Sequence, residues 1–408
     1  MSNLSNIICS RQLQGVRYEI RGRLGNRAHE MELEGCEILY LNIGNPGLFG
    51  LRTPESMRLA MIENLEASEA YCPQRGVFPA REAVVMQQQE RGIMDVKAEN
   101  VFIGNGVSEL IDLSLRALLN PGDEVLIPSP DYPLWTAATL LNGGKAIHYP
   151  CPEENNFAPD ISELERLITA KTRALVVINP NNPTGAVYSQ ECLASLAKLA
   201  EKHELVLFSD EIYDQMVYDD AQFIPLATLC EGTMCATFSG LSKVYRACGY
   251  RVGWVSFSGA LEQSKDYLAA LDLLAALRLC SNVPGQWAVQ AALGGYQSIK
   301  QLCEPGGRLY ESRSTIVEEA RKSPYLHLKK PHGAMYAFLG VNTELLKGFD
   351  DEAFALDLLE QEHVLVAPGS SFNAQYRDHF RITTLPDAET LVEVFTRMER
   401  TLKSMATK

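Results

Sequence analysis

The chain lacks several patterns that would assign it to a particular class of protein. Its 408 residues carry a net charge of −14, and this acidic excess disfavours nucleic acid or an anionic membrane as a partner. No apolar run reaches the ~18 residues of a membrane-spanning helix. The first ten residues lack the basic and apolar regions of a secretory signal. We therefore expect a cytoplasmic protein that binds neither nucleic acid nor a membrane.

The ten cysteines also lack a pairing pattern. No two of them have the C-x-x-C spacing of a zinc site or a redox motif, so we expect reduced thiols and no bound metal. Internal repeats and low-complexity segments are missing as well. The length exceeds that of one hydrophobic core, and 46% of the residues are hydrophobic, which predicts a large globular domain with a smaller second one.

Short β-branched runs alternate with longer helical patterns in the middle of the chain. This alternation indicates a mainly parallel α/β sheet with helices on both faces. Asp160 and Glu163 have the spacing of a capping box at the start of one helix. The predicted strands are 101–103, 124–127, 174–178 and 205–208, and the predicted helices are 108–119, 161–168 and 189–203.

The pattern changes after about residue 290, where helices separate short strands in what we predict to be a smaller α/β domain. The predicted helices there are 309–322, 351–363 and 387–402, and the predicted strands are 335–339 and 379–383. We divide the chain into residues 1–50 (an N-terminal arm and part of the small domain), 51–290 (the large domain) and 291–408 (the small C-terminal domain).

One lysine stands among small residues in the stretch from Phe238 to Trp254. It is Lys243, and Arg251 follows eight positions later. A lysine in mostly apolar surroundings can act as a nucleophilic amine that forms an imine with a carbonyl, and an arginine can bind a phosphate with two hydrogen bonds. The pair suggests pyridoxal phosphate (PLP), which has both an aldehyde and a phosphate. The ordinary alternative is a surface lysine on a helix.

A glycine-rich segment, Gly104 to Glu109, joins a predicted strand to a predicted helix. The amides of Val107 and Ser108 at the start of that helix, with the Ser108 hydroxyl, suit a phosphate. A dinucleotide site is the competing interpretation, but Glu109 stands where G-x-G-x-x-G would have its third glycine.

Two further polar groups follow buried strands, where open α/β sheets bind ligands. Asn182 lies in a turn-rich segment after residues 174–178, and its amide could donate to a phenolate oxygen, although the segment could be only a turn. Asp210 follows residues 205–208 and could hold a pyridinium N–H, with Tyr213 donating to the same ring oxygen as Asn182. The alternative for Asp210 is a helix N-cap.

Two more residues suit a flat, anionic ligand. Tyr132 lies in the constrained stretch Pro130-Asp-Tyr-Pro133 and could stack on a ring, or it could simply pack in the core. Arg381 lies in a strand-like run and needs an anion if it is buried. A substrate carboxylate would satisfy it, and so would an internal salt bridge.

Taken in order, these motifs resemble the class I and II aminotransferases, which have the PLP-dependent transferase fold type I. The resemblance covers nearly the whole chain and is closest to the bacterial alanine (glutamate–pyruvate) aminotransferases. Matching stretches include Leu41-Asn-Ile-Gly-Asn-Pro46, Gly240-Leu-Ser-Lys-Val-Tyr-Arg246 and His379-Phe-Arg-Ile-Thr383. One departure is Gly240, three residues before the lysine, where many members have a phosphate-binding serine; the alanine-type members also tend to have glycine there.

The resemblance implies a role for each residue. Lys243 would form the imine with PLP, Asp210 would pair with the ring nitrogen, Tyr213 and Asn182 would flank the ring oxygen, and Tyr132 would stack on the ring. The phosphate would be held by Val107, Ser108, Ser242 and Arg251, with Tyr71 reaching it from the neighbouring subunit of a homodimer. The substrate would be bound by Gly44, Asn182, Arg381, Tyr18 and Arg21.

The implied reaction is a reversible ping-pong transfer of the amino group of alanine to 2-oxoglutarate, giving pyruvate and glutamate. Arg21, or else Arg17, would bind the second carboxylate of glutamate. An aminotransferase of broader or different specificity, or a PLP-dependent C–S lyase, would keep almost all of these residues. A PLP-binding transcription regulator is disfavoured. Only about 50 residues precede the core, they show no helix-turn-helix pattern, and the chain as a whole is strongly acidic.

Overall fold

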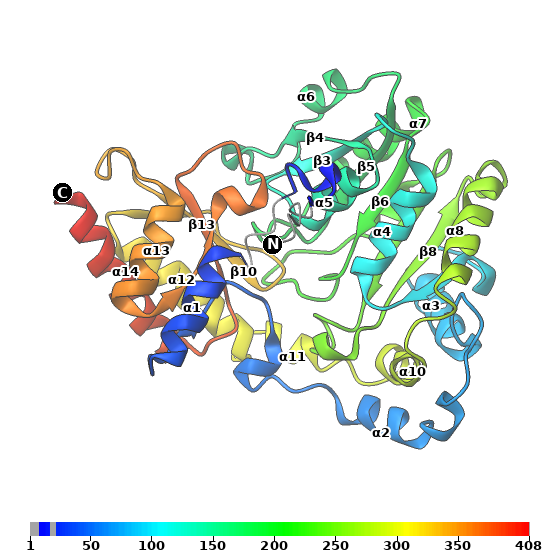
Figure 1. Cartoon of the computed structure of the whole chain (residues 1–408), viewed down its shortest axis with the longest axis horizontal. Helices are drawn as coiled ribbons and strands as arrows, with labels where there is room; N and C mark the ends of the chain where they lie inside the picture. The colour runs from blue at the N-terminus through cyan, green and yellow to red at the C-terminus, as the bar shows by residue number, and fades with distance from the viewer. Residues whose placement is uncertain (1–7, 17–21, 408) are drawn as a thin grey trace, which may run out of the picture.

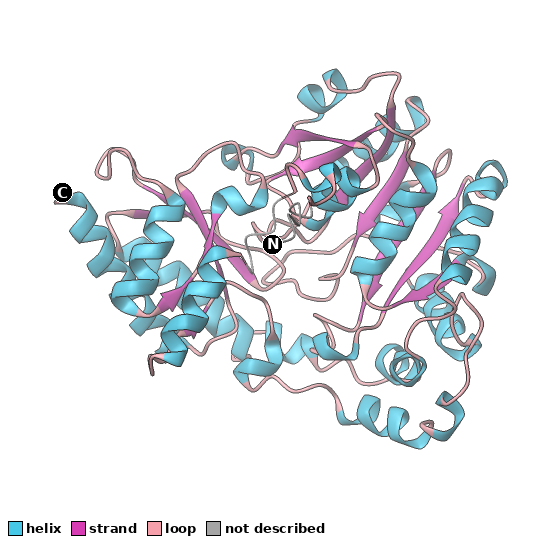
Figure 2. Ribbon diagram, in the orientation of Figure 1, coloured by secondary structure: helices cyan, strands magenta, loops and turns pink. Residues whose placement is uncertain are grey.

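Most elements of the chain gather around two larger sheets, and β1 and β11 form a separate two-stranded sheet. The structure, a computed structural model, describes residues 8–16 and 22–407. A seven-stranded sheet lies on the right of Figure 1, and a smaller four-stranded sheet lies on the left among α1, α12, α13 and α14. Helices cover both faces of the larger sheet (Figure 2).

The seven-stranded sheet has the order β2-β8-β7-β6-β5-β3-β4. Its neighbours from β7 to β4 pair in parallel, and β8 pairs antiparallel with both β7 and β2. The mainly parallel sheet that the sequence predicts is therefore confirmed. The strands are β2 (Val101–Gly104), β3 (Glu124–Ser129), β4 (Lys145–Pro150), β5 (Thr172–Ile178), β6 (Val206–Asp210), β7 (Met234–Gly240) and β8 (Gly253–Gly259).

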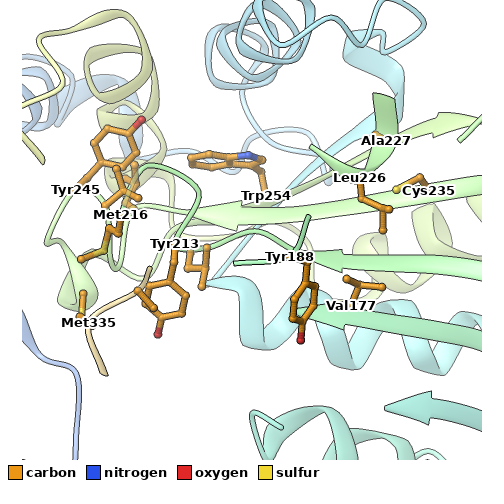
Figure 3. Packing of buried hydrophobic residues seen from close by; sticks show 14 of the residues in the cluster. Val177, Tyr188, Tyr213, Met216, Leu226, Ala227, Cys235, Tyr245, Trp254 and Met335 are labelled. Atoms are coloured by element: carbon orange, nitrogen blue, oxygen red, sulfur yellow. The ribbon is translucent and has the colours of Figure 1, made fainter. Parts of the chain in front are cut away.

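Both faces of this sheet are buried, which explains why its strands have few polar residues. Along β5, Leu175 and Val177 join the hydrophobic cluster on one face, while Val176 and Ile178 join the cluster on the other. Figure 3 shows part of the first cluster, in which Trp254 of β8 and Val177 are labelled. Side chains that alternate between two cores fix the register of the strand.

The helices of this unit divide between the two clusters. Buried residues of α3, α6, α7 and α10 belong to the first cluster, and those of α4, α5 and α8 belong to the second. The helices are α2 (Glu55–Glu63), α3 (Phe78–Glu90), α4 (Val107–Leu118), α5 (Leu134–Leu141), α6 (Ile161–Arg166), α7 (Gln190–Lys202), α8 (Lys265–Leu277), α9 (Val283–Gln286), α10 (Ala288–Gly294) and α11 (Ile299–Cys303).

The four-stranded sheet is antiparallel and has the order β12-β13-β10-β9. The N-terminal part of the chain joins this unit, because α1 contributes to its core and β1 pairs in parallel with β11. The elements are α1 (Arg23–Leu33), β1 (Leu39–Tyr40), α12 (Arg308–Lys322), β9 (Leu326–Leu328), β10 (Tyr336–Val341), α13 (Asp351–Glu362), β11 (Val364–Leu365), β12 (Ala367–Pro368), β13 (His379–Thr383) and α14 (Ala388–Ala406).

The predicted helices and strands are confirmed to within a few residues, apart from α14, which runs four residues further than expected. The capping box is present only in part. Asp160 accepts hydrogen bonds from the amides of Ser162 and Glu163, but the Glu163 carboxylate pairs with Arg166 instead of returning to the cap. The division at residues 50 and 290 stays a prediction.

Two findings concern the environment of the chain. All ten cysteines are free thiols. Within residues 8–16 and 22–407, no helix combines the length and the apolar character needed to cross a bilayer.

Candidate active site

A cavity of about 650 Å³ lies beyond the carboxyl ends of the parallel strands, where the two sheets meet. Strands β5, β6 and β7 each end at its wall, and Tyr336 of β10 and Arg381 of β13 close it from the smaller sheet. This is the ligand position expected for an open α/β sheet. The predicted residues that line the cavity are Gly44, Val107, Ser108, Tyr132, Asn182, Asp210, Tyr213, Ser242, Lys243, Arg251 and Arg381.

Lys243 lies in the loop that leaves β7. Its Nζ donates a hydrogen bond to the carbonyl oxygen of Gly44 at 2.7 Å. Leu241 and Val244 beside it are buried, and the amide of Arg246 closes the turn onto the Lys243 carbonyl at 3.0 Å. The apolar setting expected from the sequence therefore exists, and the amine faces the cavity instead of the surface.

Asp210 is the last residue of β6 and is only 3% exposed. Its carboxylate accepts hydrogen bonds from Trp135 Nε1 at 3.1 Å and from the amide of Ile212 at 3.4 Å. Burial raises the pKa of Asp210 to about 6, and these neutral donors only partly oppose that effect. Residues 212–215 form turns and no helix begins directly after Asp210, so the N-cap alternative does not apply. The carboxylate is suited to a cationic N–H donor in the cavity.

Tyr213 points from the buried cluster of Figure 3 toward the smaller sheet, on the side where Met335 is labelled. Its hydroxyl donates to the hydroxyl of Tyr336 at 3.2 Å. Burial raises the pKa of Tyr336, but the charges of Lys243 and Arg381 outweigh burial and lower it overall. Sequence reasoning missed Tyr336; the available signal was a tyrosine at the first position of an apolar strand.

Arg381 is 1% exposed. Its Nη1 donates to Asn182 Oδ1 at 2.7 Å, and Nη2 donates to the carbonyl of Asn42. The guanidinium carbon lies 4.1 Å from the centre of the Tyr336 ring. Because the Asn182 oxygen accepts from Arg381, the Asn182 NH₂ group is the donor that this side chain can offer to a ligand.

Gly44 allows the two sheets to approach each other. A Cβ atom at this position would lie 2.9 Å from Cζ of Tyr336 and 3.0 Å from the sulfur of Met335. Glycine is therefore required where the N-terminal segment passes between Lys243 and Tyr336.

The opposite end of the cavity is built for an anion. Val107 and Ser108 begin α4, a helix of 12 residues whose first amides are free of intrahelical partners. The guanidinium of Arg251 lies across Gly106, donating to the carbonyls of Cys248 at 2.9 Å and Asn105 at 3.3 Å. Gly106 has φ +86°, and a Cβ there would lie 2.9 Å from Cζ of Arg251.

Glu109 explains why the third glycine of a dinucleotide fingerprint is missing. Its carboxylate accepts from the amide of Asn105 at 2.8 Å and pairs with Arg278 at 3.3 Å. The Glu109 side chain thus binds the backbone of the segment before α4 and occupies the space that a second phosphate would need.

Gly240 also has a structural reason. A Cβ there would lie 2.8 Å from the Val252 carbonyl oxygen and 2.9 Å from Gly253 Cα. Gly240, Gly253 and Gly104 are cross-strand neighbours on β7, β8 and β2, and a Cβ on Gly253 would lie 2.5 Å from the amide nitrogen of Val107. Gly253, in the middle of this row, lets the first turn of α4 rest directly on the sheet.

The family model of the class I and II aminotransferases matches residues 37–397. The chain belongs to this family. It is 46% identical over 397 residues to the glutamate-pyruvate aminotransferase AlaA of Escherichia coli K12, covering 97% of this chain and 98% of that one. It is 48% identical over 396 residues to an alanine aminotransferase of Mycobacterium tuberculosis H37Rv, covering 97% and 92%. A crystal structure of an Escherichia coli aminotransferase has a TM-score of 0.96 at 46% identity and covers 98% of this chain and 99% of that one.

As a member of this family, the chain is an aminotransferase that acts on amino acids and 2-oxo acids. Members of the family are in general PLP-dependent. The other predicted site residues are not among the described residues that line the cavity. Tyr71 is 78% exposed on the surface of its own chain. Tyr18, Arg21 and the alternative Arg17 lie outside the described residues. The role of every site residue toward a ligand stays a prediction.

Proposed function

We propose that this aminotransferase uses PLP to transfer the amino group of alanine to 2-oxoglutarate, producing pyruvate and glutamate. The observation that carries the proposal is the presence of an amine, a buried carboxylate and an anion site in one cavity, on Lys243, Asp210 and Arg251. The choice of alanine is supported by relatives at 46% and 48% identity that are named for that amino acid.

The residues present fit PLP. A buried carboxylate whose present donors are neutral matches a protonated ring nitrogen, which would give Asp210 a cationic partner. The start of α4 with Arg251, Ser108 and Ser242 matches a phosphate. Tyr213 and the NH₂ group of Asn182 supply the donors for the ring oxygen, and Tyr132 supplies a flat face.

When bound, PLP supplies an aldehyde carbon for the amine and a ring that accepts the electron pair released at the substrate Cα. Lys243 Nζ would take the proton from the substrate Cα as a base and would return it as an acid later in the transfer. Asp210 keeps the ring nitrogen protonated through this transfer. The same residues act in reverse on the second oxo acid.

Arg381 is our candidate for binding the α-carboxylate of the substrate, together with Asn182 and Gly44. Its guanidinium is buried and already oriented by Asn182, Asn42 and the Tyr336 ring. A group held in place before the substrate arrives loses little entropy on binding.

The second carboxylate of glutamate needs another cation, for which we propose Arg21, with Arg17 as the alternative and Tyr18 beside the substrate. Kinetics of Arg21→Ala with each substrate test this assignment. We expect a higher KM for glutamate and 2-oxoglutarate and little change for alanine. Equal losses for alanine and glutamate would contradict a role in side-chain recognition.

We further propose a homodimer in which Tyr71 reaches the phosphate bound by the partner. Tyr71 is 78% exposed, and the apolar side chains of Leu65 and Phe78, which are near it in sequence, are 51% and 54% exposed. Mixing Tyr71→Phe chains with Lys243→Ala chains tests the sharing. One site of a mixed dimer would have both wild-type residues, so sites with wild-type PLP affinity and activity should reappear; if Tyr71 acts within its own chain, they should not.

A cytoplasmic location completes the proposal. The ten free thiols suit a reducing compartment. Fractionation of cells that express the full chain would test it.

A screen of half-reactions tests the function. The PLP-loaded enzyme is mixed with single amino acids, and the conversion of the cofactor to its amine form is followed by absorbance. Alanine and glutamate should convert it fastest. Faster conversion by aromatic or branched-chain amino acids would indicate the broader aminotransferase, and release of a thiol from a sulfur amino acid would indicate the C–S lyase.

A further inference from the structure

Three potential metal ligands converge outside the cavity just described. Glu153 Oε2 lies 3.2 Å from His327 Nε2 and 3.4 Å from His379 Nε2, and the three ligand atoms lie within 4.8 Å of one another. The three residues come from different parts of the fold. Glu153 follows β4 of the seven-stranded sheet, whereas His327 on β9 and His379 on β13 belong to the four-stranded sheet.

A glycine between the two histidines lets their rings approach each other. In the register of the sheet, Gly340 on β10 is the neighbour of both His327 and His379. A Cβ on Gly340 would collide with the imidazole of His327, so that ring lies directly over the glycine. Strands two apart are separated by about 9.6 Å, and the imidazoles bridge that gap only because the middle position has no side chain.

His379 is held in the orientation that a metal ligand requires. It is 4% exposed, and its Nδ1 lies 2.9 Å from Asp378 Oδ1. In the neutral tautomer whose Nδ1–H donates to the carboxylate, the lone pair is on Nε2. That Nε2 atom is buried and has no hydrogen-bond partner, since the approach to Glu153 lacks the required geometry. The Phe338 ring, stacked at 5.0 Å, fixes the plane of the imidazole.

The Glu153 carboxylate is also placed to bind a cation. Its side chain is 19% exposed, and Oε2 faces the Nε2 atoms of both imidazoles.

We propose that Glu153, His327 and His379 bind a divalent transition-metal ion of the zinc type. Ligand atoms bound tetrahedrally at about 2.0–2.2 Å lie about 3.3–3.5 Å from each other, and the 3.2 Å and 3.4 Å separations are close to that spacing before any metal is bound. Two imidazoles with one carboxylate favour zinc over magnesium or calcium. The sequence-based expectation of no metal site relied on cysteine spacing, which this ligand set does not use.

The fourth position of the ion opens to solvent. His327 is 45% exposed, and a recess of about 270 Å³ beside it is lined also by Glu154, Leu328 and Lys329. A water molecule can complete the coordination there, and the recess gives the ion a route in.

The ion would join the two sheets at a point close to the cavity. His379 precedes Arg381 by two residues on β13, and Glu153 belongs to the larger unit. A metal bound between them would hold β13, and with it Arg381, against the loop after β4. The site is thus structural: it positions part of the smaller sheet without touching the substrate.

Metal titration of the PLP-loaded full-length enzyme tests this proposal. Co²⁺ should produce the visible bands of a tetrahedral ion, and Zn²⁺ should displace it at about one equivalent per chain. His327→Gln should lower the affinity for Zn²⁺ by about 100-fold or more, because it removes one of three ligands, and Asp378→Asn by about 10-fold, because it removes only the orienting carboxylate.

The matched control is His203→Gln, which removes a histidine that faces Glu165 at 3.5 Å without a third ligand nearby among the described residues. Circular dichroism verifies that the variants are folded. The proposal is overturned if the wild type binds no Co²⁺ or Zn²⁺ at micromolar concentration, or if His327→Gln binds them as tightly as His203→Gln. Turnover is not part of this readout, so failure here leaves the aminotransferase proposal intact.

Discussion

Each of the two larger sheets contains a row of cross-strand neighbours in which glycine stands in place of a residue with a side chain. One row accommodates backbone atoms, and the other accommodates an imidazole ring. In the larger sheet, Gly253 admits the backbone at the start of α4, while its neighbours Gly104 and Gly240 admit α4 side chains and the backbone of Val252 and Gly253. In the smaller sheet, Gly340 admits the imidazole of His327. A backbone neighbour cannot move without shifting a helix, whereas the end of a side chain can rotate away. The first row should therefore tolerate substitution much less well than the second.

The largest effect should come from removing the Lys243 amine. Lys243→Ala should lower turnover by about 10⁴-fold, since it removes the amine proposed to move the proton at the substrate Cα. The absorbance of PLP joined to the lysine should disappear, while the phosphate end still binds PLP. Steady-state kinetics and a spectrum measure both effects, and retained turnover would refute the assignment.

Asp210→Asn should change stability by up to about 3 kcal/mol, by an amount that depends on pH and with a sign that depends on the cofactor. In the cofactor-free chain the pKa of Asp210 is raised to about 6. The folded state therefore keeps this proton at pH values where the unfolded state has lost it. The resulting stability is present below about pH 4 and disappears as the pH rises through 6. Asparagine never ionises, so the cofactor-free variant should match the wild type at pH 3.5 and exceed it by about 3 kcal/mol at pH 8.

Denaturant unfolding at several pH values measures this difference. With PLP bound the sign should reverse, because the ring N–H loses its anionic partner in the variant. A constant difference across pH would show that folding does not raise the pKa of Asp210 in the cofactor-free chain.

Gly253→Ala tests the row in the larger sheet directly. Its Cβ would lie 2.5 Å from the Val107 amide nitrogen, so α4 must shift. We expect a loss of about 1–3 kcal/mol in the free energy of unfolding and weaker PLP binding through a displaced phosphate site. Gly294→Ala is the control, because nothing lies within 4 Å of a Cβ at that position. Unchanged PLP affinity in Gly253→Ala would contradict the proposed role of the row.

Gly340→Ala should have the smallest effect on stability, below about 1 kcal/mol, because the His327 ring can rotate out of the way. Binding of Zn²⁺ should nevertheless weaken by about 10-fold or more, since one ligand leaves its position. Thermal unfolding and metal titration separate the two effects. The comparison between the rows fails if Gly340→Ala is as destabilising as Gly253→Ala.

The sequence predicted best what depends on neighbours along the chain. Buried strands with a polar residue just beyond their ends identify Asp210, Asn182 and Lys243, because carboxyl ends of parallel strands meet at one edge. Tyr336 could not be found in this way, since the four-stranded sheet faces the cavity only through tertiary packing.

The glycine rows and the proposed metal site were also beyond sequence reasoning. Gly104, Gly240 and Gly253 become neighbours only through strand register. Glu153 and His327 are 174 residues apart. The capping box at Asp160 failed in its second half because Arg166, one turn ahead, competes for the Glu163 carboxylate.

The hydrogen bond from Lys243 to the Gly44 carbonyl has a consequence for how often the amine can change partners. A carboxylate in that place would hold the ammonium group in a deep energy well. A neutral carbonyl accepts a hydrogen bond from a charged donor that is worth about 1.5–3 kcal/mol net, and it has no charge that would be left unpaired when the amine departs. The resting position is therefore a shallow minimum, from which the lysine can move to a ligand and return in every catalytic cycle.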